Sequence, residues 1–265
     1  MLELTQPEAD AVRPLLDSVP FNELFARVVV EGTARGQVLA DSLDSPRAAW
    51  ITHSYGMSLL VGDPAALSDE AFCSLVARPR ARDEWLQVHP EAWADRIDAL
   101  IALGPRDGGR VRRHTRVNFQ FRAARYASIR HEVDCSRCEV ARVDEGIFHA
   151  MRGSVVPAGF WDSAKAFVER GLGFAVMSEG CPAAVAFSSF VRGNLLELGI
   201  ETAPAFRGRG LARTACVALI DACLARGLTP VWSCRLGNAP SFRLAESLGF
   251  EPTLRLPYYQ LLTNE

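Results

Sequence analysis

The stretch Arg207-Gly208-Arg209-Gly210-Leu211-Ala212 decides how this chain folds. It follows an apolar segment typical of a strand, residues 195–202, and precedes an apolar helical segment that runs to Arg226. Glycine at 208 and 210 lets the backbone turn tightly and aim successive N–H groups outward. Those donors, with the partial positive charge of a helix N-terminus, suit a phosphate or pyrophosphate. The stretch therefore predicts a strand–loop–helix unit that binds a phosphorylated ligand.

Two familiar phosphate-binding loops are excluded by spacing. The sequence contains no Gly-x-x-x-x-Gly-Lys-Ser/Thr pattern, and Arg213 stands where a dinucleotide fold requires a third glycine or an alanine. A Gly-x-Gly pair before a helix is by itself an equally common sign of a tight structural turn. The elements around the loop must therefore decide between the two interpretations.

The second half of the chain predicts alternating strands and helices. Asp162 or Ser163 caps a helix that ends near Arg170. Three strands with hairpin turns follow, at 173–178, 183–191 and 195–202. After the glycine loop and its helix we predict a strand at 231–235 and a short helix from about Pro240 to Leu248.

This combination resembles the GNAT superfamily of acyl-CoA N-acyltransferases over about residues 140–260. The resemblance rests on Arg-x-x-Gly-x-Ala at 207–212, on Asn238, and on Leu248-Gly249-Phe250. Residues at the family's fourth strand and loop entry are also similar, namely Ile200, Thr202, Pro204 and Phe206. More narrowly, the chain resembles a bacterial GNAT subfamily with an extra N-terminal lobe; the similar stretches are 38–41, Ser45-Pro46, 161–163, 171–174, 200–202 and 230–234.

The resemblance implies direct transfer of an acetyl group from acetyl-CoA to the primary amine of a small molecule, in a ternary complex. The loop would take the coenzyme A pyrophosphate, and strand N–H groups around residues 200–202 would hold the pantetheine and polarise the thioester carbonyl. The implied coenzyme-binding residues are Ile200, Thr202, Arg207, Gly208, Arg209, Gly210, Leu211, Ala212, Asn238 and Ser241. For Asn238 and Ser241, plain helix capping is the equal alternative.

Transfer needs a base, and the strand at 195–202 offers Glu197 and Glu201 on one face, because strand side chains alternate with a period of two. A solvated strand face is the equal alternative. The family's usual tyrosine acid would fall at Ala245, which cannot donate a proton. Substitutes for it are Tyr258, Tyr259, Ser233 and Cys234. A non-catalytic acyl-CoA-binding or interaction protein that has lost its general acid is therefore the alternative function.

The first half predicts a second, mixed α/β lobe. We expect helices near 8–17, 68–76 and 92–103, and strands near 27–31, 38–40, 48–52, 57–61 and 117–121. Polar stretches at 104–114 and 130–139 bracket a linker, so we predict lobes at 1–130 and 131–265. The fold class is α/β (α+β), with a mixed, mostly antiparallel twisted sheet flanked by helices. The first lobe would be a degenerate half of the same fold that binds no coenzyme and completes the acceptor cleft.

Composition limits the partners of the chain. The net charge is −2 and no apolar run approaches membrane-helix length, which predicts no nucleic-acid and no membrane partner. The N-terminus is not a secretory signal, so we expect a cytoplasmic protein, with a homodimer left open. The pair Cys135 and Cys138 lacks the further ligands that zinc requires, so we predict no metal. Among the arginines of 110–130 a solvated face is favoured; alternatively, Arg116 or Arg122 pairs with a carboxylate of the acceptor.

Overall fold

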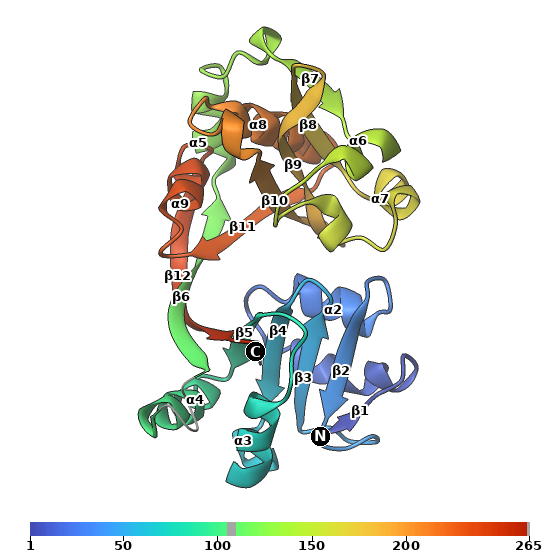
Figure 1. The fold of residues 1–265 in the computed structure, drawn as a ribbon, viewed down its shortest axis with the longest axis vertical. Coiled ribbons are helices and arrows are strands. Elements are labelled where there is room, and N and C mark those ends of the chain that lie inside the picture. The colour runs from blue at the N-terminus through green and yellow to red at the C-terminus, as the bar shows by residue number, and fades with distance from the viewer. Residues whose placement is uncertain (105–109, 264–265) are drawn as a thin grey trace. The chain divides into compact units, whose positions relative to one another are not determined.

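The computed structural model describes residues 1–104 and 110–263, which form two compact units (Figure 1). Unit 1 comprises Met1–Val117, Arg235–Gly237 and Arg255–Glu265, and unit 2 comprises Asn118–Cys234 and Asn238–Leu254. Two long strands, β6 (Val111–Phe121) and β12 (Phe250–Leu261), contribute residues to both units. The units therefore divide within these strands and not at the predicted position 130/131. The predicted linker region instead contains β6 and the helix α5 (Ala123–Arg130).

Unit 1 is built on a sheet whose strand order is β1-β2-β3-β4-β5-β12-β6. Strands β1 to β4 pair antiparallel, β5 runs parallel to β4, and β12 runs antiparallel to β5. The strands are β1 (Leu2–Glu3), β2 (Gly36–Ala40), β3 (Ala48–His53), β4 (Met57–Gly62) and β5 (Glu84–His89). The helices are η1 (Glu8–Val12), α1 (Arg13–Leu16), α2 (Leu24–Val30), η2 (Pro64–Ala66), α3 (Asp69–Ala77) and α4 (Ala92–Ala102).

The core of unit 1 on the α3 and α4 side is a cluster around Trp50, Trp93 and Tyr259, all completely buried. Ser68 begins α3 because its Oγ accepts a hydrogen bond from the Ala71 N–H. One predicted strand, residues 27–31, is wrong because this segment belongs to α2. Three consecutive valines favour a strand, but Val28, Val29 and Val30 are buried on a helix, where packing overrides their propensity.

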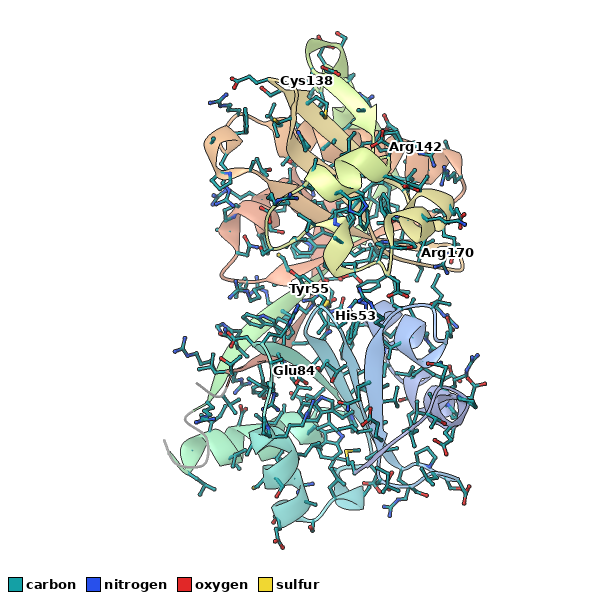
Figure 2. The ribbon with its side chains drawn as sticks, turned by 45° about the vertical axis from the view of Figure 1, so that its right-hand side comes forward. His53, Tyr55, Glu84, Cys138, Arg142 and Arg170 are labelled. Carbon is teal, nitrogen blue, oxygen red and sulfur yellow. The ribbon has the colours of Figure 1, made fainter. Side chains whose placement is uncertain are left out.

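Buried polar contacts fix β5 in unit 1. The carboxylate of Glu84, labelled in Figure 2, accepts hydrogen bonds from the indole N–H of Trp50 at 2.7 Å and from Ser58. It also pairs with Arg78 and Arg80, each at 3.0 Å. The carboxylate is 5% exposed, so this charge is held inside by its two arginines.

Unit 2 carries the second sheet segment, with strand order β12-β6-β11-β10-β9-β8-β7. Helix α8 contacts β8, β9 and β10. The strands are β7 (Glu139–Arg142), β8 (Gly173–Ser178), β9 (Cys181–Arg192), β10 (Leu195–Thr202) and β11 (Thr229–Arg235). The helices besides α5 are η3 (Cys135–Arg137), α6 (Glu145–Ala150), η4 (Pro157–Gly159), α7 (Ala164–Arg170), η5 (Pro204–Phe206), α8 (Leu211–Ala225) and α9 (Ala239–Glu246).

The predicted fold class is confirmed: the chain is α/β, with a mixed and mostly antiparallel sheet flanked by helices (Figure 1). The predicted strands and helices of the second half lie within two residues of β8, β9, β10, β11, α7 and α9. No helix of the described ranges combines the length and the apolar character that crossing a membrane requires.

Candidate functional site

Two neighbouring strands of unit 2 separate at the middle of β10. Strands β10 and β11 pair in parallel over Leu195–Glu197, whereas β10 continues along β9 as far as Thr202. The β10–β9 register shifts between Glu197 and Leu198, where the extra residue on β9 is Ser189. A bulge of this kind bends a strand and increases its twist. The second half of β10 is therefore released from β11, and its β11-facing edge has no strand partner among the described residues.

The released end of β10 leads through η5 into the glycine loop. Gly208 and Gly210 both have φ of 77°, a left-handed backbone conformation that residues other than glycine rarely adopt. Gly210 is the N-cap of α8, and its carbonyl accepts from the N–H groups of Arg213 and Thr214. Among the described residues the N–H groups of residues 208–212 have no backbone acceptor. These donors could therefore serve a ligand, and their binding of a phosphorylated group stays a prediction.

The loop's surroundings are open and positively charged. A Cβ added at Gly208 or Gly210 would meet no atom within 4 Å. The guanidinium of Arg207 donates from Nε to the carbonyl of Thr202 at 3.1 Å, and the guanidinium of Arg209 lies 5.2 Å from the ring centroid of Phe206. Leu211 and Ala212 form the first turn of α8. The loop thus combines unpartnered N–H groups, free space and two cations.

Glu201, one of the two predicted bases, is tied to a neighbouring loop. Its Oε2 accepts from the backbone N–H groups of Ser154 and Val155, both at 3.0 Å. Its Oε1 accepts from the N–H of Thr202 at 3.2 Å and lies 3.5 Å from the guanidinium of Arg207. This carboxylate acts as a clamp between the loop at 153–155 and the entry of the glycine loop. The Thr202 N–H, predicted to face the pantetheine, is engaged by the same clamp.

Glu197 has different surroundings. It is 6% exposed, and its Oε1 accepts a hydrogen bond from the hydroxyl of Ser233 on β11 at 3.2 Å. Glu197 is also the last residue of β10 that pairs with β11. It therefore stands at the point where the two strands separate, in contrast to the clamp residue Glu201. Ile200 follows Glu197 on the released half of β10 and is half-buried.

Asn238 and Ser241 serve the start of α9. The Asn238 Oδ1 accepts from the Ser241 N–H at 3.3 Å, so Asn238 caps the helix. The Ser241 hydroxyl accepts from the indole N–H of Trp232 at 3.2 Å. Asn238 thus has the capping role that the sequence left as its alternative to coenzyme contact, whereas the Ser241 side chain binds Trp232 instead of capping the helix.

The position at which the family has its tyrosine acid is buried in this protein. Ala245 lies in α9 and is completely buried. Tyr259 belongs to the core of unit 1, where burial and Asp98 raise the pKa of its hydroxyl above the ordinary value. Tyr258 is also in unit 1, and its hydroxyl accepts from Arg116. Ser233 and Cys234 lie on β11 beside the separation point, and Ser233 already donates to Glu197.

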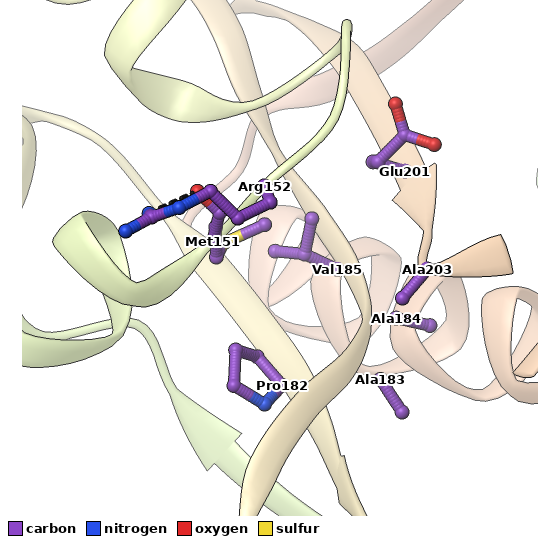
Figure 3. Close-up of a pocket in the computed structure, with 8 residues that line it drawn as sticks. All are labelled: Met151, Arg152, Pro182, Ala183, Ala184, Val185, Glu201 and Ala203. Carbon is purple, nitrogen blue, oxygen red and sulfur yellow. Dashed lines mark hydrogen bonds between the residues drawn. The ribbon is translucent and has the colours of Figure 1, made fainter. Parts of the chain in front are cut away.

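A small pocket lies beside the clamp, with a volume of about 10 Å³, near the minimum for one water (Figure 3). Its lining residues are Met151, Arg152, Pro182, Ala183, Ala184, Val185, Glu201 and Ala203. Met151 and Arg152 carry no signal in the sequence, and the loop at 153–155 that follows them brings them beside Glu201. Gly153, with φ of 141°, permits this approach because a Cβ there would overlap the Glu201 carboxylate at 2.6 Å. That glycine is the one local signal for the clamp.

Within residues 1–104 and 110–263 no cluster of histidine, cysteine and acidic side chains could hold a metal ion. Cys135 and Cys138 are free thiols, and burial raises the pKa of Cys135 above its ordinary value. Such a thiol is a poor nucleophile at neutral pH, because the reactive form is the thiolate.

Comparison with known proteins places this geometry in a family. The GNAT acetyltransferase family model matches residues 14–259. The uncharacterized N-acetyltransferase YdfB of Bacillus subtilis is 24% identical over 263 residues, covering 97% of each chain. The [ribosomal protein bS18]-alanine N-acetyltransferase of Escherichia coli is 37% identical over 93 residues, 34% of this chain and 63% of that one. A solved GCN5-related N-acetyltransferase-like protein from Streptococcus suis shares the fold, with a TM-score of 0.75 at 22% identity over 96% of this chain and 98% of the other. The chain belongs to the GNAT acetyltransferase family.

Proposed function

We propose that the protein transfers an acetyl group from acetyl-CoA to the primary amine of a small molecule, by direct transfer in a ternary complex. One observation carries the proposal: the separation of β10 from β11 leads directly into a glycine loop whose N–H groups have no backbone acceptor in the described part of the chain. Family membership supports acyl transfer in general, and the loop geometry supports the coenzyme as donor.

The residues of the loop fit a pyrophosphate. A doubly anionic group needs several donors and positive charge, which residues 208–212, Arg207 and Arg209 provide. It also needs room, and the positions of Gly208 and Gly210 are open. The released half of β10 offers further backbone groups along a strand edge, as an extended amide chain such as pantetheine would require. When bound, acetyl-CoA supplies an activated thioester.

Glu197 is the residue we assign as base. An amine acceptor is protonated near neutral pH, so a proton must leave it before it can attack a carbonyl. Glu197 stands where the strands separate, and the hydroxyl of Ser233 holds one of its oxygens. The carboxylate can therefore accept that proton directly or through one water. Glu201 has a structural role instead, since both of its oxygens bind backbone N–H groups.

The first experiment is calorimetric titration of acetyl-CoA into the wild type and into Arg207→Glu/Gly210→Asp. The variant places two carboxylates in the loop, so we expect at least about a 100-fold loss of affinity, equivalent to about 2.7 kcal/mol. The matched control is Arg226→Glu/Gly180→Asp, with the same exchanges at the end of α8 and in a hairpin turn. Lack of binding to the wild type would contradict the proposal, and so would equal binding to both double variants.

The second experiment addresses catalysis. A general base is worth about 10²–10⁴-fold in rate, so Glu197→Gln should lower kcat for an amine acceptor by that order while leaving acetyl-CoA affinity unchanged. An unchanged kcat in this variant would remove Glu197 from the mechanism.

A second candidate function, a non-catalytic acyl-CoA-binding protein, is favoured by one observation. The position of the family's proton donor is the buried Ala245. However, a thiol with a pKa of about 8.5 is a tolerable leaving group without an acid. The two functions separate on turnover: an enzyme releases free coenzyme A when an amine is added, and a binding protein releases none.

A further inference from the structure

Two cysteines of unit 2, Cys135 and Cys138, have no part in the proposed function and lie three residues apart. They bracket the 3₁₀ turn η3, and Cys138, labelled in Figure 2, immediately precedes β7. Both are free thiols and both are partly exposed, whereas Cys216, Cys223 and Cys234 are buried. A small molecule in solution can therefore reach this pair.

The turn brings the two cysteines within disulfide reach. The N–H of Cys138 donates to the carbonyl of Cys135 at 3.2 Å, which closes a turn between residues i and i+3. Such a turn keeps its end Cα atoms within about 7 Å of each other, and disulfides join Cα atoms about 4.4–6.8 Å apart. Side chains three residues apart in a 3₁₀ turn also lie on the same side. A bond between the two sulfurs therefore requires rotation of the side chains and little movement of the backbone.

Contacts on both sides hold the turn in place. Before it, Arg130 donates from Nη1 to the carbonyl of Val133 at 3.1 Å and from Nε to Asp221 of α8 at 2.6 Å. Within it, the Oδ1 of Asp134 accepts from the N–H of Ser136 at 3.0 Å and caps the turn. Directly after it, β7 pairs with β8. The two thiols are thus held near each other before they react, which raises the effective concentration of one toward the other.

The surroundings of Cys135 distinguish the two thiols. Burial is the main cause that raises the pKa of the Cys135 thiol, and Arg130 opposes it. The charges of Asp221, Cys138 and Asp134 raise this pKa further. Because the thiolate is the nucleophile, Cys135 is the less suited of the two to attack first. It is also the poorer leaving group, so a disulfide between the two resists cleavage at the Cys138 sulfur.

We propose that Cys135 and Cys138 form a redox-active dithiol that exchanges with low-molecular-weight disulfides in solution. The Cys138 thiolate attacks one sulfur of the small disulfide, which gives a mixed disulfide and releases one small thiolate. The Cys135 thiol then loses its proton to solvent and attacks the Cys138 sulfur, which closes the bond between the cysteines and releases the second small thiolate. The two protons that the cysteines lose balance the two that the released thiolates take up. The pair is thus oxidised by two electrons and the small disulfide is reduced to two thiols.

The experiment treats the reduced full chain, without coenzyme, with excess glutathione disulfide. After an acid quench, N-ethylmaleimide blocks the remaining thiols and the monomer is digested with trypsin without reductant. Trypsin cleaves after Arg130, Arg137 and Arg142, so the two cysteines fall on separate peptides, 131–137 and 138–142, which only a disulfide joins. We expect the joined peptides to exceed the glutathione-bearing forms of either peptide by at least about 10-fold. Peptides that each carry glutathione, or that both stay blocked by maleimide while the exposed Cys181 reacts, would overturn the proposal.

Single variants test the order of attack. In Cys135→Ser the remaining Cys138 should stop at the mixed disulfide with glutathione. In Cys138→Ser the remaining Cys135 should form the same adduct at least about 3-fold more slowly. Equal rates would overturn the assignment of Cys138 as first nucleophile. The control Cys181→Ser removes an exposed thiol outside the turn and should leave the joined peptides unchanged; their loss in this variant would show that the pair does not react on its own.

A chase with dithiothreitol under native conditions separates an exchanging pair from a permanent disulfide. We expect the joined peptides to disappear and both thiols to return, because both cysteines are partly exposed. Joined peptides that persist through the chase would overturn the exchange. The reaction uses neither acetyl-CoA nor the glycine loop, so its outcome is independent of acetyl transfer.

Discussion

The two units repeat one order of elements but end it differently. In unit 1, β2, β3 and β4 pair antiparallel, α3 follows, β5 returns parallel to β4, and α4 leads into β6. In unit 2, β8, β9 and β10 are followed by α8, by β11 parallel to β10, and by α9 and β12. This agreement in order fits the prediction that the N-terminal lobe is a degenerate half of the same fold.

The difference lies between the two parallel strands. In unit 1, β4 pairs with β5 over Met57–Val61, nearly the whole strand, whereas in unit 2 the pairing stops at Glu197. The loops also differ. Asp63 accepts from the Ala65 N–H, and Asp69 and Glu70 occupy the first turn of α3, where unit 2 has glycines and arginines. In unit 1, carboxylates therefore already neutralise the N-terminus of α3. One fold can therefore be closed or open to an anionic ligand according to strand register and loop charge.

The largest expected effect tests whether the buried carboxylate of Glu84 stabilises unit 1, where β4 and β5 stay paired. Glu84→Leu leaves Arg78 and Arg80 without their buried partner, so it should cost about 3–5 kcal/mol in unfolding free energy. Acetyl-CoA affinity of the folded fraction should not change. Chemical denaturation measures the cost. The control is Asp69→Ala, which removes the exposed ion pair of Asp69 with Arg96 and should lose at most about 0.5 kcal/mol. A loss below about 1 kcal/mol for Glu84→Leu would contradict the assigned role.

The next effect concerns the clamp in unit 2. Glu201→Ala removes the acceptor for the N–H groups of Ser154 and Val155, so we expect about 2 kcal/mol of lost stability and faster proteolysis of the loop at 153–155. Calorimetry and limited proteolysis measure both. Glu201→Gln keeps one acceptor oxygen and should restore part of the loss. Resistance of the alanine variant to proteolysis would show that the loop does not depend on the clamp.

A smaller effect sharpens the role of the glycine loop. Gly210→Ala and Gly180→Ala each put a side chain at a left-handed position with open space, so each should cost about 1 kcal/mol. Only Gly210→Ala should also weaken acetyl-CoA binding, because it disturbs the N-cap of α8. Equal coenzyme affinity in the two variants, measured by titration, would argue that the loop is only a turn.

The smallest effect compares two helix caps. Ser68 begins α3 in unit 1 and Asn238 begins α9 in unit 2, and alanine at either should cost about 0.5–1 kcal/mol. If Asn238 has only its cap role, its variant will match Ser68→Ala in stability and leave acetyl-CoA affinity unchanged. A loss of acetyl-CoA affinity in Asn238→Ala but not in Ser68→Ala would support the predicted contact of Asn238 with the coenzyme.

Local signals account for most of what the sequence predicted. Glycines and turn residues mark the limits of β8, β9 and β10, and the loop at 207–212 is visible from its two glycines alone. Features that depend on pairing between distant segments were not predictable. The bulge at Ser189 lies where β10 leaves β11, and its one local sign is Gly199, where a Cβ would overlap Phe187 and Ser189. The glycine does not reveal which neighbouring strand ends there. Strand β5 was not predicted either, because Glu84 and Gln87 make it polar in sequence although neighbouring segments bury both residues.

The strand β12, which contributes residues to both units, has a consequence for how the protein folds. Tyr259 and Leu261 lie in the core of unit 1 and pair with β5, although residues 255–261 follow all of unit 2 in the chain. During synthesis, unit 1 therefore stays incompletely folded until residues 255–261 have been made. Until then one edge of β5 is unpaired and the core lacks Tyr259 and Leu261. Such exposed edges attract other chains, so the nascent N-terminal segment is the part most exposed to aggregation. The two units cannot mature in the order in which they are made.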